Sequence, residues 1–255
     1  MEQLLQKIHR DSGSHKGQNG KVLVIGGSEK YTGAPALAAQ AALRSGADLV
    51  KVLTSEDAKP VVQGFSENLI VESYGETFDE GSLRKAWELE EWADTTVVGA
   101  GLVDFDPVTL KEFAEEAGRL VVDAAAIEPL LEFTDNIFTP HSGEAEAIRQ
   151  EYGSEKDFAA ETGSTVLLKG EVDKVFSEET VFENDTGCAG MTVGGTGDVL
   201  AGLVAGFRSQ DLADVEASRL AAYVNGRAGE KVFEEHGNGL VATDLLDFIP
   251  AVLKE

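Results

Sequence analysis

Short runs of β-branched and apolar residues alternate along this chain with longer segments of helical composition. The runs lie at residues 21–26, 49–53, 68–72, 96–99, 120–123, 137–139 and 165–168. The helical segments lie at residues 35–46, 80–92, 107–117, 142–151, 197–208, 213–235 and 242–253. Strands that alternate with helices in this way form a mostly parallel sheet covered by helices on both faces. The pattern therefore predicts an α/β fold built on one such central sheet.

The spacing of these segments also predicts a single domain over residues 1–255. No internal repeat, low-complexity tract or Pro/Ser-rich linker interrupts the sequence. Two short β-rich pieces within residues 173–182 predict a hairpin. Pro35 is predicted to be the first residue of the helix that ends before Gly46, because proline is favoured at that position.

Carboxylates dominate the charge of the chain, with 46 Asp and Glu against 21 Lys and Arg and a formal net charge of -25. Such a surface repels phosphate backbones and anionic lipids, so nucleic-acid binding and membrane binding are not expected. The acidity is typical either of an ordinary acidic protein or of adaptation to molar salt, where screening acts within about 3 Å. The acids are spread along the chain in short clusters, which favours adaptation to salt.

Three further features predict a cytoplasmic protein. Cys188 is the only cysteine, which excludes an internal disulfide and a cysteine metal cluster. No apolar run approaches the roughly 18 residues of a membrane span. The N-terminal residues contain neither the apolar core nor the cleavage site of a signal peptide.

Glycine-rich turns follow several predicted strands, at the edge of a parallel sheet where ligands bind. Gly26-Gly27 follows the first strand, and residues 31–34 (YTGA) lead into the next helix. Gly99-Ala100-Gly101 follows another strand. Each turn is compatible with a ligand approaching the backbone or with plain turn geometry. His141 lies in a third strand-end loop, where a packing role and a functional role are both open.

The segment Gly194-Gly195-Thr196-Gly197-Asp198 is the most informative, because its glycines precede an amphipathic helix. Successive backbone N–H groups at such a turn form an anion cradle, which the helix dipole reinforces. No Gly-Lys-Ser/Thr follows, so the turn is not a Walker P-loop. Asp198 is compatible with a helix cap or with a group that accepts a reacting proton. Lys169 follows another predicted strand, where it is compatible with a nucleotide ligand or with an ordinary surface lysine.

Several motifs together resemble the ADP/ATP-dependent NAD(P)H-hydrate dehydratase family, a group of ribokinase-like enzymes. They match the family in order and spacing over about residues 16–250. The motifs are KGQNGKVLVIGGSEKYTGAPALAAQAALRSGADLVKV, VVGAGL, VVDAAAI, TPHSGEAEAI, VLLKG, NDTGCAGMTVGGTGDVLAGLVAGF and GNGLVATDLLDFIP. The glycine turn alone is shared by many ribokinase-like enzymes, whereas the ordered set is specific.

The resemblance implies a ribokinase-like fold and repair of the hydrated S-epimer of NADH or NADPH, with ADP or ATP as co-substrate and Mg2+. It implies that Asp198 is the catalytic residue and contacts the hydrate together with Ala34, Gly101 and His141. It implies that the adenine nucleotide binds Lys169, Gly170, Glu171, Val172, Asp173 and Gly197; the anion cradle adds Gly194, Gly195 and Thr196. It further implies a homo-oligomer, a tetramer in many members.

Two positions depart from the family pattern. The family commonly reads Asp-Ala-Asp-Ala where this chain reads Asp123-Ala124-Ala125-Ala126, which removes a carboxylate and leaves the metal ligands unassigned. A lysine that commonly precedes the glycine turn is replaced in the sequence Thr192-Val193-Gly194, so bound cations are expected to supply positive charge there.

Two other functions are compatible with the same turn. A ribokinase-like kinase for a vitamin precursor, such as a hydroxymethylpyrimidine or a thiazole alcohol, would use Asp198 but release a phosphorylated product. A nucleotide-binding regulatory module would bind ADP or ATP without releasing phosphate.

Overall fold

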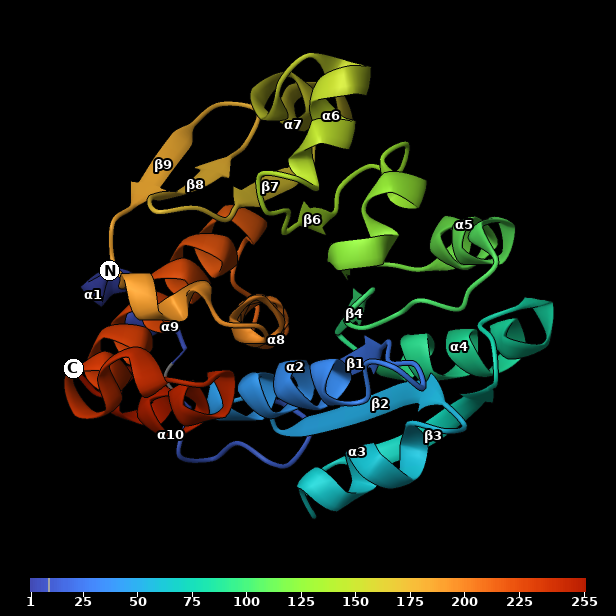
Figure 1. Cartoon of the computed structure of the whole chain (residues 1–255), viewed down its shortest axis with the longest axis horizontal. Coiled ribbons are helices and arrows are strands. Elements are labelled where there is room, and N and C mark those ends of the chain that lie inside the picture. Colours follow the sequence, from blue (N-terminus) through green and yellow to red (C-terminus); the bar gives the residue numbers. More distant parts are fainter. Residues whose placement is uncertain (9) are drawn as a thin grey trace.

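A nine-stranded sheet forms the centre of the protein in the computed structural model, which describes residues 1–8 and 10–255 (Figure 1). The strand order is β3-β2-β1-β4-β5-β6-β7-β8-β9. The strands are β1 Lys21–Ile25, β2 Leu49–Ser55, β3 Ile70–Gly75, β4 Thr95–Val98, β5 Leu120–Val122, β6 Ile137–Phe138, β7 Thr165–Leu168, β8 Asp173–Phe176 and β9 Val181–Asn184. All neighbours from β3 to β7 pair in parallel, whereas β7-β8 and β8-β9 pair antiparallel. The predicted mostly parallel sheet and the predicted hairpin are both confirmed.

Ten α-helices are described, and they cover both faces of this sheet (Figure 1). They are α1 Glu2–Lys7, α2 Gly33–Arg44, α3 Lys59–Phe65, α4 Glu80–Trp92, α5 Pro107–Glu116, α6 Ala145–Tyr152, α7 Glu155–Thr162, α8 Thr196–Arg208, α9 Asp214–His236 and α10 Ala242–Val252. Short 3-10 turns lie at Ala124–Ala126, Glu128–Leu130, Ala189–Thr192 and Gly237–Gly239. No helix among the described residues is long and apolar enough to cross a membrane.

Two hydrophobic cores result from the alternation of side chains along each strand. In β1, Val22 and Val24 face the core formed with α2, α8, α9 and α10. Leu23 and Ile25 of the same strand face the second core, formed with α4, α5, α6 and α7. Because both faces of the central strands are covered, these strands are apolar at nearly every position.

Close packing between α2 and α8 fixes where α8 begins. A Cβ atom at Gly202 of α8 would collide with the backbone carbonyl of Ala38 in α2, and one at Gly206 would collide with Ser45. On the α2 side the contact is made by alanines, whose side chains are also small. Ala38 and Ala42 are fully buried there. The absence of side chains at the contact therefore lets the two helices approach closely, with the start of α8 beside the first turn of α2.

Three details differ from the sequence prediction. Pro35 is the third residue of α2 and not the first, because the helix already begins at Gly33. The edge strand β3 covers Ile70–Gly75, which is shifted from the predicted residues 68–72. The helices α1, α3 and α7, which have only 6, 7 and 8 residues, were not predicted.

Candidate active site

Two strand-end loops meet at the carboxyl edge of the sheet. The loop after β6 contains Pro140 and His141, and the loop after β7 begins with Lys169. His141 and Lys169 form an isolated parallel bridge, in which the Lys169 N–H donates to the Pro140 carbonyl at 2.8 Å. The neighbouring positions of β6 and β7 in the sheet thus bring together two of the predicted site residues.

The side chain of Lys169 lies among carboxylates. Its Nζ donates to Asp123 Oδ1 at 2.9 Å and lies 3.8 Å from Glu144 Oε2. The same Asp123 oxygen accepts a hydrogen bond of 2.7 Å from Thr139, and Asp123 is only 3% exposed. Burial alone would lower the pKa of Lys169, but Asp123 and Glu144 outweigh it and raise the pKa. Lys169 is therefore protonated at neutral pH, and it is not a surface lysine.

Asp198 lies at the third position of α8, and its carboxyl group has a strongly perturbed pKa. Burial is the largest cause, the negative charge of Asp123 adds to it, and the two raise the pKa of Asp198 to about 7 against the opposing effect of Lys169. The N-cap of α8 is Gly195, so Asp198 is not the cap of this helix. A carboxyl group with a pKa near neutrality is suited to accept a proton during a reaction.

The turn before Asp198 requires glycine for two reasons. Gly195 has a φ of 98°, a backbone conformation that side chains disfavour, and a Cβ there would lie 2.7 Å from Leu37 Cδ1. A Cβ at Gly197 would lie 3.4 Å from Lys169 Nζ, which places the ammonium group against the turn. The hydroxyl of Thr196 donates to the Met191 carbonyl at 2.9 Å and secures the preceding 3-10 turn.

The residues predicted to bind the hydrate form two groups in contact with this centre. Gly101 has a φ of 69°, and a Cβ there would lie 2.9 Å from Ala34 Cβ, so these two residues are neighbours. Ala34 lies in the first turn of α2, one turn before the Leu37 side chain that meets Gly195. The Ala34–Gly101 pair and the α8 turn are thereby joined through the first turns of α2.

His141 forms the second group, and its hydrogen bonds show which ring nitrogen carries the proton. Nδ1 accepts from the N–H groups of Gly143 and Glu144, both at 3.0 Å, so in the neutral ring the proton is on Nε2. The ring remains exposed, and Nε2 lies 3.4 Å from Glu144 Oε1. His141 can therefore offer a hydrogen-bond donor to a ligand at this edge of the sheet.

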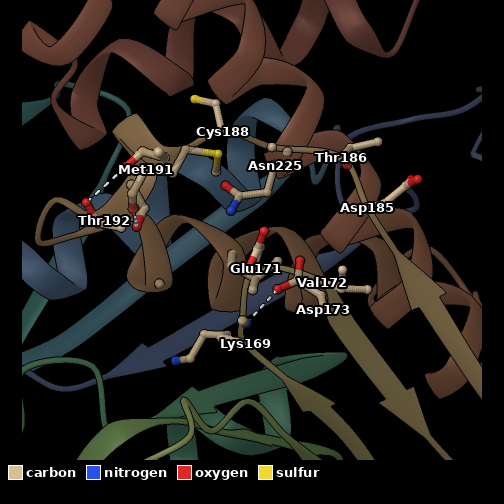
Figure 2. A pocket seen from close by; sticks show the side chains of 17 residues that line it. Lys169, Glu171, Val172, Asp173, Asp185, Thr186, Cys188, Met191, Thr192 and Asn225 are labelled. Atoms are coloured by element: carbon tan, nitrogen blue, oxygen red, sulfur yellow. Dashed lines mark hydrogen bonds between the residues drawn. The ribbon is translucent and has the colours of Figure 1, made fainter.

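A cavity of about 660 Å³ opens beside the α8 turn (Figure 2). Its lining residues are Lys169, Gly170, Glu171, Val172, Asp173, Asp185, Thr186, Gly187, Cys188, Ala189, Met191, Thr192, Thr196, Gly197, Leu200, Asn225 and Gly226. The predicted nucleotide residues 169–173, 196 and 197 all line it, whereas Gly194 and Gly195 shape the turn without lining it. Burial raises the pKa of Asp173, whose carboxylate accepts from the Gly170 N–H at 3.1 Å.

Sequence reasoning missed two parts of the cavity wall. The segment at residues 185–192 belongs to one of the motifs that carry the resemblance, but its residue types do not indicate a role. Asn225 and Gly226 lie inside the long helix α9, where no local signal marks them. Lys169 is the only cationic residue among those that line the cavity, against three carboxylates at Glu171, Asp173 and Asp185.

The carboxylates near the α8 turn are few for a magnesium ion. In the described part of the chain, no group of three or more His, Cys, Asp or Glu side chains is arranged to hold a metal. Ala125, where the family pattern has a carboxylate, is exposed in a 3-10 turn. Mg2+ commonly binds one or two carboxylates together with substrate phosphates. The donor set fits an ion held mainly by the phosphates of a nucleotide, with Asp123 and Glu144 as the nearby carboxylates.

Comparison with known proteins gives consistent matches along the chain. Residues 22–251 match the family described as NAD(P)H-hydrate dehydratase. The chain is 38% identical over 254 residues to an ADP-dependent (S)-NAD(P)H-hydrate dehydratase from Haloterrigena turkmenica, covering 98% of this chain and 99% of the relative. It is 39% identical over 258 residues to the protein of that name from Natrialba magadii, covering 100% and 99%. The structure of the ADP/ATP-dependent NAD(P)H-hydrate dehydratase from Bacillus subtilis, co-crystallised with ATP and Mg2+, superimposes with a TM-score of 0.82 at 27% identity, covering 99% of this chain and 96% of that one.

Proposed function

Because the chain belongs to the NAD(P)H-hydrate dehydratase family, we propose that it restores NADH or NADPH from the S-epimer of the hydrate with ADP as co-substrate. The observation that carries this proposal is the Asp198 carboxyl group, whose pKa is raised to about 7 at the start of α8, beside the cavity. The names of the relatives from Haloterrigena and Natrialba favour ADP over ATP.

The reaction needs a poor leaving group to be made into a good one. The hydroxyl of the hydrated nicotinamide ring gives its proton to Asp198, and its oxygen forms a bond to the terminal phosphorus of ADP. The bond between that phosphorus and the oxygen of AMP breaks, and AMP leaves. The lone pair of the ring nitrogen then expels phosphate by breaking the carbon–oxygen bond, and loss of a ring proton restores the dihydronicotinamide.

The residues of the chain align these groups and hold negative charge. The N–H groups of the turn at residues 194–197 and the Lys169 ammonium, which lies against this turn, are proposed to bind the phosphates. In such sites one well-placed donor contributes about 3 kcal/mol to transition-state stabilisation. A bound Mg2+ would supply further positive charge to the phosphate oxygens, with Asp123 and Glu144 as the available carboxylates.

The substrates are assigned to two sides of the α8 turn. We assign the hydrate to the edge formed by Ala34, Gly101 and His141, and the adenine nucleotide to the cavity lined by residues 169–173. The turn with Asp198 joins both groups, since Gly195 meets Leu37 of α2 and Gly197 meets Lys169. This arrangement supports direct transfer of the terminal phosphoryl group from the nucleotide to the hydrate.

Replacing His141 with alanine is expected to raise the KM for the hydrate about 2- to 12-fold, which corresponds to one hydrogen bond of about 0.5–1.5 kcal/mol. The melting temperature should fall only slightly, because the ring is exposed and water can replace it at the N–H groups of Gly143 and Glu144. Steady-state kinetics and thermal melting check this, with the exposed His15→Ala as the control. A large loss of stability with unchanged kinetics would assign His141 to structure.

We propose that the protein works in high salt. With a net charge of -25, its carboxylates repel one another in dilute solution. The melting temperature and the activity are therefore expected to rise between dilute and molar KCl. Thermal melts and assays across this range test the expectation. A melting temperature that is unchanged or higher at low salt would reject adaptation to salt.

Three further properties are proposed from the sequence and the family resemblance. Residues 1–255 are proposed to act as one domain. The protein is proposed to work in the cytoplasm, and its copies to associate as a homo-oligomer, a tetramer by resemblance.

The experiment that tests the proposed function incubates the purified protein with NADH hydrate and ADP. We expect the dihydronicotinamide absorbance to recover only when nucleotide is present. A kinase for a vitamin precursor would leave the hydrate unrepaired and would accumulate a phosphate ester only when its alcohol and ATP are supplied, and a regulatory module would bind ADP without releasing phosphate. Absence of absorbance recovery with ADP and with ATP would overturn the proposal.

A further inference from the structure

Asn225 combines deep burial with an unsatisfied polar group. It lies in the middle of α9 and is 7% exposed, among buried apolar residues such as Ala222, Val224 and Ala228. Its Oδ1 atom is buried and has no hydrogen-bond partner within the described residues. Burial of an unpaired amide costs free energy, so buried side-chain amides normally have partners. An apolar residue would serve the packing of α9 better at this position.

The position of Asn225 in the cavity wall follows from the glycines that come after it. A Cβ at Gly226 would collide with Thr186, and one at Gly229 would collide with Met191. These glycines let the segment at residues 185–192 lie directly on α9. Figure 2 shows the Asn225 amide pointing from α9 into the cavity, opposite Glu171.

The cavity wall combines polar and apolar surface. Lys169, Thr196 and Gly197 lie where the ammonium group meets the first turn of α8, which suits phosphates. Val172 and Met191 supply apolar surface elsewhere on the wall, which suits the faces of a flat ring. A nucleotide with its phosphates at Lys169 would extend its base along this wall, which the Asn225 amide also lines.

We propose that Asn225 determines the base specificity of the nucleotide site by hydrogen bonding the edge of adenine. Rotation of the amide about its Cβ–Cγ bond turns the buried Oδ1 toward the cavity, where it accepts from the 6-amino group. An amide presents one donor beside one acceptor, and rotation about its Cβ–Cγ bond can turn either toward the ligand. The inference rests on the proposed nucleotide site but concerns a residue that the reaction itself does not use.

The test measures the Kd of ADP and of purine riboside diphosphate, which lacks only the 6-amino group. The wild-type protein is expected to bind ADP at least tenfold more tightly than the analogue. In Asn225→Ala and Asn225→Ser the two ligands should bind with similar affinity, because the partner of the amino group is gone. Thr192→Val is the matched control, since Thr192 lines the cavity but its hydroxyl already donates to the Ala189 carbonyl at 3.0 Å; the ratio should stay at the wild-type value.

Melting without nucleotide separates base recognition from a structural role. Removal of an unpaired buried amide should leave the melting temperature unchanged or raised, while the increase caused by ADP becomes smaller. A wild-type ratio of the two Kd values in both Asn225 variants would overturn the inference, as would equal weakening of both ligands, which indicates a ribose contact. A wild-type protein that binds no ADP would overturn the proposed function and this inference together, whereas an unchanged ratio leaves the function standing.

Discussion

Replacing Asp198 with asparagine is expected to lower kcat at least a hundredfold. Asparagine keeps the size of the side chain and part of its hydrogen bonding, but it cannot accept the proton of the hydrate hydroxyl. Loss of a general base costs roughly 10²–10⁴-fold in rate. The fold should persist, because the N-cap of α8 is Gly195 and the substitution leaves it intact.

Nucleotide affinity provides the internal control for this variant. A carboxylate near phosphate is repulsive in the ground state, so Asp198→Asn should bind ADP as tightly as the wild type or more tightly. Single-turnover kinetics and ADP titration of the same preparation measure the two effects. Near-wild-type turnover in the asparagine variant would remove Asp198 from the mechanism.

Replacing Lys169 with methionine is expected to have the second largest effect, and it should change three quantities. ADP affinity should fall about 10- to 150-fold, the equivalent of a hydrogen bond to a charged group of about 1.5–3 kcal/mol. The free energy of unfolding should fall by about 3 kcal/mol, because the buried Asp123 loses its cation. We take the lower end of the range for buried pairs because Lys169 retains some exposure.

The pH profile of kcat is the third quantity. Asp198 must be ionised to accept a proton, so the wild-type rate should fall as the pH drops through about 7. Lys169 lowers the pKa of Asp198, while burial, Asp123 and Glu144 raise it. In Lys169→Met the acidic limb should therefore move to higher pH. Lys174→Met is the matched control, since Lys174 forms an exposed ion pair with Glu183 on the hairpin; an unshifted limb in Lys169→Met would contradict the assignment of that limb to Asp198.

The sequence predicts this fold well wherever a segment is long or strongly apolar. The helix α8 is predicted because its apolar residues repeat at helical spacing, and α4 is predicted from its helical composition. The short helix α7 was missed although Ser154 caps it and Gly163, with a φ of 68°, ends it. Only Gly153 and Ser154 separate α7 from α6, so the sequence shows no clear boundary between the two helices.

The sequence does not predict which charged side chains are buried. Arg208 ends α8, where a basic residue is favoured by the helix dipole even on a surface. In the structure it is 2% exposed and donates to Asp214 at 2.8 Å and to the Leu120 carbonyl at 2.8 Å. Residue type and spacing cannot show such a role, because the partner in β5 is distant in the chain.

The same limit applies to the site. Asp198, His141 and Lys169 each follow a strand or a glycine turn, so local pattern together with the family resemblance could identify them. The charge environment of Asp198 could not be predicted, since Asp123 and Glu144 reach it from other loops. Asn225 is one polar residue in a 23-residue helix, and only the folded chain places it in the cavity wall.

Transfer of an oxygen isotope tests the proposed reaction most directly. NADH hydrate labelled with 18O in its ring hydroxyl is incubated with the protein and ADP, and the released phosphate and water are analysed by mass spectrometry. Because the hydroxyl oxygen attacks phosphorus before the carbon–oxygen bond breaks, one 18O atom should appear in phosphate for each dihydronicotinamide restored, with one AMP formed. Label in water, with unlabelled phosphate, would show that dehydration proceeds without phosphorylation and would contradict the mechanism built on Asp198.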